Sequence, residues 1–149
     1  MYNKYLEELG IPREEYDYTT WGNCKRIRKI KKKTGLDFRE CYQFDLTLAH
    51  YLYSMLKLYT KYTVTDLKYE RQTFGDFEGT LYDAIKQVCK GLKLYIKYDF
   101  LTSSLTKKQK KKVAKYLGVS IDDLNYGSMV EVYKKALHLF ADIAPCIWD

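Results

Sequence analysis

The sequence has few of the residues on which metal-binding and redox motifs depend. Its 149 residues include two histidines, two prolines and four cysteines. No two cysteines form a C-x-x-C pair, and their spacing fits no zinc or haem pattern. We therefore expect no metal site and no cofactor, and we expect these side chains to pack on or inside helices. They are Cys24, Cys41, Cys89, Cys146, His50 and His138.

Longer catalytic and targeting motifs are missing as well. The chain contains no Gly-rich phosphate loop, no G-x-S-x-G, no H-E-x-x-H and no D-x-D metal pair. No apolar run is long enough to span a bilayer, and the first five residues do not begin a signal peptide. These absences favour a non-enzymatic, cytoplasmic protein with reduced thiols. A nuclease-like enzyme with scattered ligands is a third hypothesis, because a fold can bring distant carboxylates together.

What is present predicts a helical fold. A hydrophobic fraction of 46% with 30% charged residues is ordinary for a globular protein, and one domain fits the whole chain, 1–149. Apolar residues recur at three- and four-residue spacing near 45–62 and 80–98. A third segment, 129–144, is apolar on two sides, which favours a central position between the other two. We predict an all-α orthogonal bundle centred on these three helices.

Capping residues predict the shorter elements. Four pairs have the spacing of a capping box: Thr80 with Asp83, Thr106 with Gln109, Ser120 with Asp123, and Ser128 with Glu131. Gly118 is expected to end the helix that follows Thr106, and the last helix is expected to end at about Ala144, before Pro145. The connection 63–79 follows neither the helical nor the strand period, so a short β-hairpin near 62–73 is possible there.

Positive charge is concentrated in two short stretches. The chain has 26 Lys and Arg against 19 Asp and Glu, for a net charge of +7. One run holds Lys25, Arg26, Arg28, Lys29, Lys31, Lys32 and Lys33, and the other holds Lys107, Lys108, Lys110, Lys111, Lys112 and Lys115. Basic residues bind phosphate because each neutralised phosphate releases condensed counterions to solvent. The two runs are therefore the candidate contacts with nucleic acid or an acidic partner, although each could also be a solvated helix face.

The sixteen tyrosines support two interpretations. Most of them fall on apolar helical faces, which is typical of partly buried seams between helices. Tyrosine is also enriched at protein interfaces and stacks on bases, which would indicate an interaction surface.

The segment from Lys112 to Leu124 contains Leu-Gly-Val-Ser followed by two aspartates and a leucine. It resembles the trailing part of a repressor-type helix-turn-helix domain over about a tenth of the chain, without the recognition helix. The same residues also form a good helix C-cap followed by a good N-cap, so they have a structural explanation.

A second likeness begins at Phe44-Asp45-Leu46-Thr47-Leu48-Ala49, an aromatic-Asp-x-Thr-x-Ala helix start. Gly91-Leu92-Lys93-Leu94 adds a Gly-hydrophobic-x-Leu stretch in a later helix. Together they resemble small helical proteins of unassigned function encoded by bacteriophages and prophages, over about a third of the chain. The resemblance implies a phage or mobile-element origin and no particular chemistry. Small phage proteins of this kind often bind host machinery, and inhibitors of CRISPR systems are one such group.

Charge and resemblance together lead to one main expectation. We expect a small basic, non-enzymatic binding protein that engages nucleic acid or a host nucleoprotein complex, or more narrowly an inhibitor of a host defence effector such as a CRISPR system. The alternative is a structural or assembly protein that binds only other proteins through its tyrosine-rich surface. Neither hypothesis requires a membrane.

Overall fold

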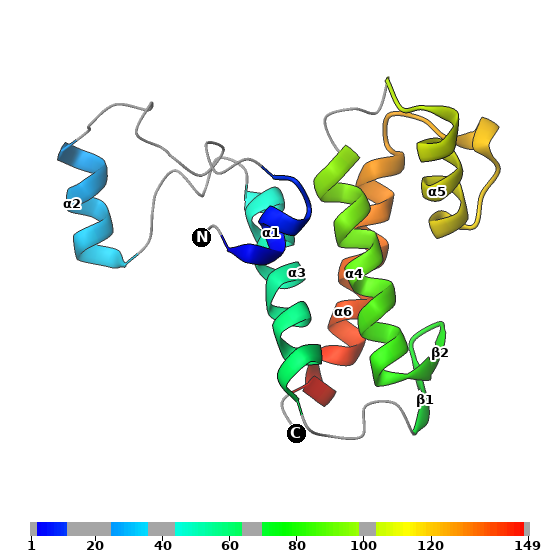
Figure 1. Cartoon of the computed structure of the whole chain (residues 1–149), viewed down its shortest axis with the longest axis horizontal. Coiled ribbons are helices and arrows are strands. Elements are labelled where there is room, and N and C mark those ends of the chain that lie inside the picture. Colours follow the sequence, from blue (N-terminus) through cyan, green and yellow to red (C-terminus); the bar gives the residue numbers. More distant parts are fainter. Residues whose placement is uncertain (1–2, 12–24, 36–43, 64–69, 99–103, 148–149) are drawn as a thin grey trace.

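The structure of the protein is a computed structural model that describes residues 3–11, 25–35, 44–63, 70–98 and 104–147. Within these ranges, six α-helices, one short 3₁₀ helix and one two-stranded antiparallel sheet follow one another along the chain (Figure 1). In order they are α1 (Lys4–Glu8), α2 (Lys25–Thr34), α3 (Phe44–Tyr62), β1 (Arg71–Phe74), β2 (Phe77–Thr80), α4 (Leu81–Tyr98), α5 (Lys107–Leu117), η5 (Ile121–Asp123) and α6 (Ser128–Ile147). The predicted all-α bundle with one short hairpin is confirmed.

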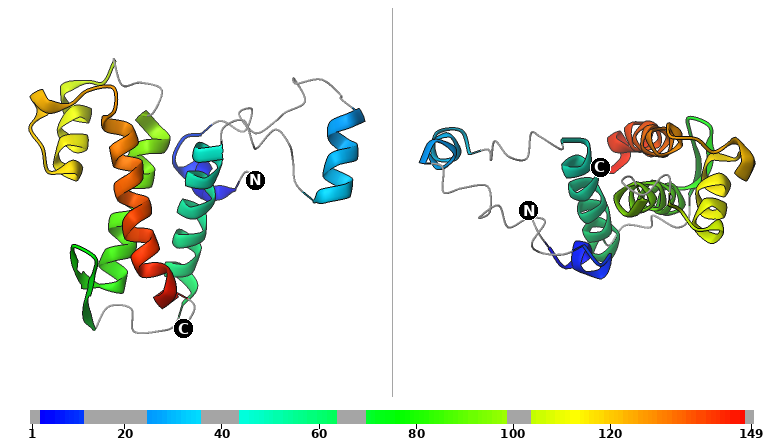
Figure 2. Two further views of the ribbon diagram at one scale, coloured as in Figure 1. Left: turned by 180° about the vertical axis from the view of Figure 1, so that it is seen from behind. Right: turned by 90° about the horizontal axis from the view of Figure 1, so that it is seen from above.

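Helix α4 is the centre of the bundle. It packs most extensively against α6 and next most against α3 (Figure 2). Its Ile85, Val88 and Leu92 are completely buried. The expectation that the last helix lies between the other two long ones is therefore wrong. Helix α6 is apolar on two sides because one side packs on α4 and another meets α5 and the hairpin.

The axes of the long helices α3, α4 and α6 are roughly aligned, with α4 antiparallel to the other two, whereas the short α1 lies across α3 (Figures 1 and 2). The crossed packing expected of an orthogonal bundle is seen where α1 meets α3. The Asn3 side chain caps α1 by accepting the Tyr5 N–H, and its amide also donates to the Ser54 hydroxyl on α3 at 3.0 Å. Tyr5 and Leu6 are buried against this contact, so α1 belongs to the core.

The helix starts follow the capping residues in three of four predicted places. Both halves of a capping box are present at Thr106 and Gln109, and again at Ser120 and Asp123. At the start of α4, the Thr80 hydroxyl accepts the N–H of Asp83 at 3.1 Å. The box at Ser128 is wrong, because Ser128 already lies inside α6 and its hydroxyl accepts the N–H of Asn125 at 2.8 Å.

Helix α6 also continues past its predicted end, through Pro145 to Ile147. A proline inside a helix removes one N–H and leaves the carbonyl four residues earlier without its bond. Here that carbonyl belongs to Ala141, and both Ala141 and Pro145 are exposed, so water can reach the open position. Buried Ile143 and Ile147 hold this last turn against the core.

The hairpin lies at residues 71–80 and not near 62–73, where residues 64–69 are outside the described ranges. Its register pairs Phe74 with Phe77 around a two-residue turn, Gly75-Asp76. Gly75 has φ +56°, which matches a type II′ turn with glycine at its first central position. The glycine was the available sequence signal. The strands themselves were too short to show a two-residue period.

Helix α2 stands apart from the other elements, on the far side of α3 from α5 (Figure 1). It ends at Gly35, which has φ +74° and whose N–H donates to the Lys31 carbonyl at 2.8 Å. None of the described helices combines the length and the hydropathy that crossing a bilayer requires.

Candidate functional site

The outward side of α4 bears a row of lysines. Lys86, Lys90, Lys93 and Lys97 are spaced four, three and four residues apart, which places them along one side of the helix, and all four are exposed. At 1.5 Å per residue, the row is about 16 Å long. These lysines do not form a run in the sequence, because apolar core residues separate them, and so the row was not predicted. Their three- and four-residue spacing was the sequence signal that indicated it.

Helix α5 faces the C-terminal half of this row across a hollow of about 290 Å³. We call it the lysine hollow. Its lining residues are Lys90, Lys93, Leu94, Lys97, Tyr98, Lys112 and Lys115. Five lysines thus line the hollow together with the buried, aliphatic Leu94 and the half-buried, aromatic Tyr98.

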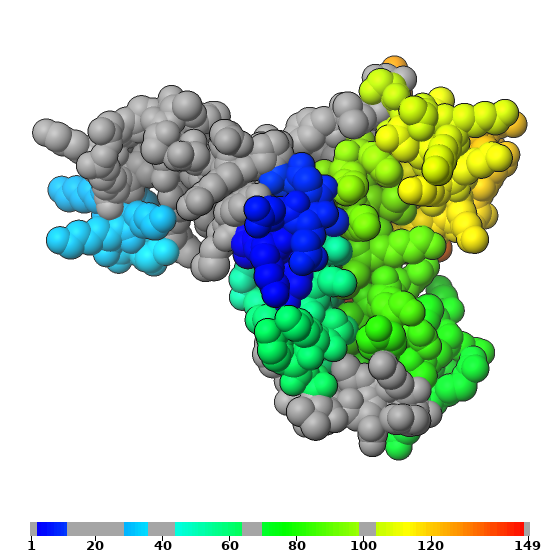
Figure 3. All heavy atoms as spheres, viewed as in Figure 1, coloured from blue at the N-terminus to red at the C-terminus, as the bar shows by residue number. Residues whose placement is uncertain are grey.

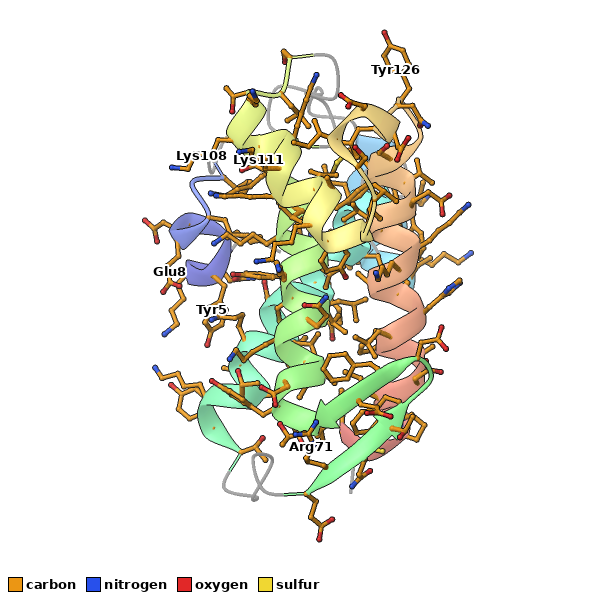
Figure 4. The ribbon with its side chains drawn as sticks, turned by 90° about the vertical axis from the view of Figure 1, so that its right-hand side faces the viewer. Tyr5, Glu8, Arg71, Lys108, Lys111 and Tyr126 are labelled. Atoms are coloured by element: carbon orange, nitrogen blue, oxygen red, sulfur yellow. The ribbon has the colours of Figure 1, made fainter. Side chains whose placement is uncertain are left out.

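Further lysines extend this surface along α5. Lys108 and Lys111 are exposed and reach out on the side of the molecule where Tyr5 and Glu8 of α1 lie (Figure 4). The space-filling view shows the surfaces of α4 and α5 adjoining on the face turned to the viewer (Figure 3). The lysine hollow and its α5 extension thus form one basic face.

The lysine hollow is electrostatically one-sided. No carboxylate is among its lining residues, and among the described residues none of its five lysines forms an ion pair. Like charges four residues apart on a helix cost about 0.2–0.5 kcal/mol per pair. The lysine row and the basic face together contain four such pairs: Lys86 with Lys90, Lys93 with Lys97, Lys108 with Lys112, and Lys111 with Lys115. The arrangement therefore makes this surface mildly self-repelling, and dissolved salt screens the repulsion.

The position of α5 is fixed by its apolar side. Val113, Ala114 and Tyr116 are buried, and the Tyr116 ring reaches α4 at Gly91. A Cβ on Gly91 would collide with the Tyr116 hydroxyl and would lie 2.8 Å from the Cβ of Ala136 on α6. Lys135 of α6 donates to the Tyr116 carbonyl at 3.0 Å. Tyr116 thus joins α5 to both central helices and sets where Lys112 and Lys115 lie.

The structure separates the residues of the two predicted basic runs. Of the α5 run, Lys112 and Lys115 line the lysine hollow, while Lys110 lines a different hollow of about 360 Å³ beside Tyr126. Lys107 is exposed at the start of α5. The first run forms α2, apart from this face, with Lys29, Lys31, Lys32 and Lys33 exposed. The side chains of Lys25, Arg26 and Arg28 are outside the described ones.

A larger cavity, about 910 Å³, lies between the hairpin, α5, η5 and α6. Its lining contains both acidic and basic residues: Asp76, Asp123, Glu131, Asp142, Lys134 and Lys135, with His138 beside them. Within the described ranges, no three His, Cys, Asp or Glu side chains gather as a metal site would require. Because acidic residues line this cavity together with basic ones, we expect it to attract an anion less strongly than the lysine hollow does.

Three groups with strongly shifted pKa values lie in the core or against it, and one of them is Tyr116, whose pKa is raised by burial. His50 on α3 is 6% exposed, and burial lowers its pKa to about 4. Burial also raises the pKa of Cys89 on α4 to about 12, so this thiol stays protonated. The His50 and Cys89 side chains pack as the sequence predicted.

Comparison with protein-family models, with curated proteins and with solved structures yields no match to this chain.

Proposed function

We propose that the protein binds nucleic acid, free or within a nucleoprotein complex, through the basic face of α4 and α5. The observation that supports this most directly is the lysine hollow, in which five lysines from two helices meet with no carboxylate among the described residues. Such a crowded positive surface favours an anion that offsets its charge.

The dimensions of the basic face suit a polyanion better than a small ion. The lysine row on α4 is about 16 Å long, so it can contact several phosphates of one strand at once, which a single small ion does not offer. Tyr98 offers a ring inside the hollow on which an unpaired base could stack. These contacts are not base-specific, so we expect affinity with weak sequence preference.

The test compares two variants with the same loss of charge. One replaces Lys90, Lys93, Lys112 and Lys115 with Gln, and the other replaces Lys4, Lys57, Lys61 and Lys134, which lie on α1, α3 and α6. Fluorescence anisotropy with labelled single-stranded DNA, single-stranded RNA and duplex DNA gives the affinity over a range of salt concentrations. We expect the hollow variant to lose affinity about tenfold or more, and its log–log salt slope to fall by about 3. The control variant should keep most of its affinity and most of its salt slope.

Two results would contradict the proposal. Equal weakening of both variants would indicate a general effect of net charge, and wild-type binding that ignores salt would exclude phosphate contacts. Thermal melts show that the comparison concerns folded proteins. Because the hollow variant breaks up like-charge pairs, it should melt at the wild-type temperature or slightly above it.

A narrower form of the proposal is inhibition of a host defence effector such as a CRISPR complex. Its support is the resemblance of the Phe44–Ala49 helix start to small phage proteins. The alternative, a protein that binds only other proteins, is favoured by a different surface, the exposed apolar side of α3.

A further inference from the structure

Helix α3 has two apolar sides, and only one of them faces the core. Ala49, Tyr53 and Leu56 are buried toward α4 and α1. On the opposite side lie five large apolar side chains that are 39–64% exposed. They are Phe44, Tyr51, Met55, Leu58 and Tyr62, and we call them the outer stripe. Five of the eight large apolar residues that the structure shows exposed belong to this one helix.

The spacing of the outer stripe is that of a helix-packing seam. Its members are seven, four, three and four residues apart, which is the alternation found where two helices pack side by side. No charged residue interrupts the stripe, although charged residues make up 30% of the chain. Single exposed apolar residues need no explanation, but a continuous row along a 19-residue helix marks an interaction surface.

We infer that the outer stripe of α3 binds the outer stripe of a second copy of this chain, with the two helices antiparallel. The two-fold axis crosses the outer side of α3 at the level of Tyr53 along the helix, because Phe44 and Tyr62, and likewise Tyr51 and Met55, are equally far from this position in the sequence. In this register, Phe44 lies opposite Tyr62 of the partner subunit, and Tyr51 lies opposite Met55 of the partner subunit. Leu48, which is partly exposed, lies opposite Leu58 of the partner subunit. A two-fold interface needs a surface that is complementary to itself, and this stripe has that property.

Charge favours the same orientation. Lys57 and Lys61 are near the C-terminal end of α3, while Asp45 in its first turn accepts a hydrogen bond from the Tyr95 hydroxyl and is turned toward α4. Antiparallel packing keeps the lysine ends of the two helices apart and opposes the two helix dipoles. Parallel packing would bring lysines to lysines.

The available area fits a weak dimer. Phe44, Tyr51 and Tyr62 are 64%, 55% and 63% exposed. At 150–250 Å² for each aromatic side chain, they offer about 300–450 Å² per copy. Two copies therefore bury about 600–900 Å² from aromatics alone, and the aliphatic members bring the total near the 1,000 Å² that a specific interface needs. We expect a dissociation constant in the micromolar range.

Sedimentation velocity from low to high micromolar concentration tests the dimer, and two single variants test its geometry. Met55→Glu and Tyr51→Lys each place a charge in the seam twice per dimer, and each should weaken association about tenfold or more. When the two variants are mixed in equal amounts, the introduced carboxylate of one copy faces the introduced ammonium group of the other. The second contact of this heterodimer is a native Tyr51–Met55 pair, so association should recover. In matched controls, Val130→Glu and Tyr126→Lys change exposed apolar residues elsewhere and should leave the dimer intact.

A wild-type chain that stays monomeric throughout this range would overturn the inference. Failure of the mixture to recover would overturn the antiparallel register. Because the outer stripe shares no residue with the lysine hollow, neither result bears on nucleic-acid binding.

Discussion

The two basic helices have similar numbers of basic residues, seven in α2 and six in α5, and very different places in the molecule. Helix α5 is capped at both ends, buries Val113, Ala114 and Tyr116, and is bonded to α6 through Lys135. Helix α2 stands apart, with Ile30 only partly buried and Lys31 to Lys33 exposed. Packing therefore fixes the charges of α5 relative to α4, whereas nothing comparable fixes those of α2 among the described residues. Charge that is held in place can match a ligand with less loss of entropy on binding.

The largest expected effect comes from breaking the attachment of α5. Gly91→Ala should lower the free energy of unfolding by about 2 kcal/mol, because the new methyl group collides with Tyr116 and Ala136 in a filled core. Urea denaturation measures this. Gly91→Ala combined with Tyr116→Phe should recover part of the loss, since the hydroxyl is the atom nearest to the new methyl group. If Gly91→Ala were stabilising, as helix propensity alone predicts, α5 would not be held through this contact.

We expect acid to destabilise the helical body of the protein through His50. His50 has a pKa lowered to about 4, whereas α2 contains no histidine and no acidic residue. Below about pH 6.5, His50 takes up a proton in the unfolded chain but not in the folded one, so the free energy of unfolding is highest above pH 6.5 and decreases as the pH falls toward 4. Urea denaturation should show a loss of about 1 kcal/mol between pH 7.5 and 5.5. A His50→Gln variant that keeps the same pH dependence would contradict this assignment.

The N-cap of α5 gives a smaller effect. Thr106 accepts the Gln109 N–H at 3.3 Å, and the Gln109 side chain accepts the Thr106 N–H at 2.7 Å. Thr106→Ala should lower the free energy of unfolding by about 1 kcal/mol, while Thr106→Ser should leave it nearly unchanged. Equal stability of the Ala and Ser variants would show that the start of α5 does not depend on its cap.

The smallest effect on stability is expected in α2. Replacing Arg26, Arg28, Lys29 and Lys32 with Gln should change the free energy of unfolding by at most about 0.5 kcal/mol, because the described side chains of α2 bury little. The same variant in the anisotropy assay sharpens the comparison of the two helices. Unchanged nucleic-acid affinity would show that α2 faces solvent and does not contact the nucleic acid. A loss of affinity as large as that of the hollow variant would show that α2 contributes as much to binding as the lysine hollow does.

The positions of the helices in the sequence could be predicted better than the way in which the helices pack against one another. Helices α3, α4 and α5 follow from apolar spacing and from caps such as Thr106 and Gly118, which act within a few residues. The central position of α4 could not be predicted in this way, because it depends on which apolar faces meet. The lysine hollow was half predicted. Lys112 and Lys115 belong to an obvious run, but Lys90 and Lys93 join them only after α4 and α5 are packed.

The crowding of lysines on α4 and α5 means that dissolved salt acts on the protein in two opposite ways. Ions screen the repulsion between neighbouring ammonium groups, so the unliganded protein should melt at a higher temperature as ionic strength rises. The same ions compete for the lysines, so the increase in melting temperature caused by a bound polyanion should shrink over the same range. If a polyanion binds as proposed, it should stabilise the fold most in dilute salt and least in concentrated salt.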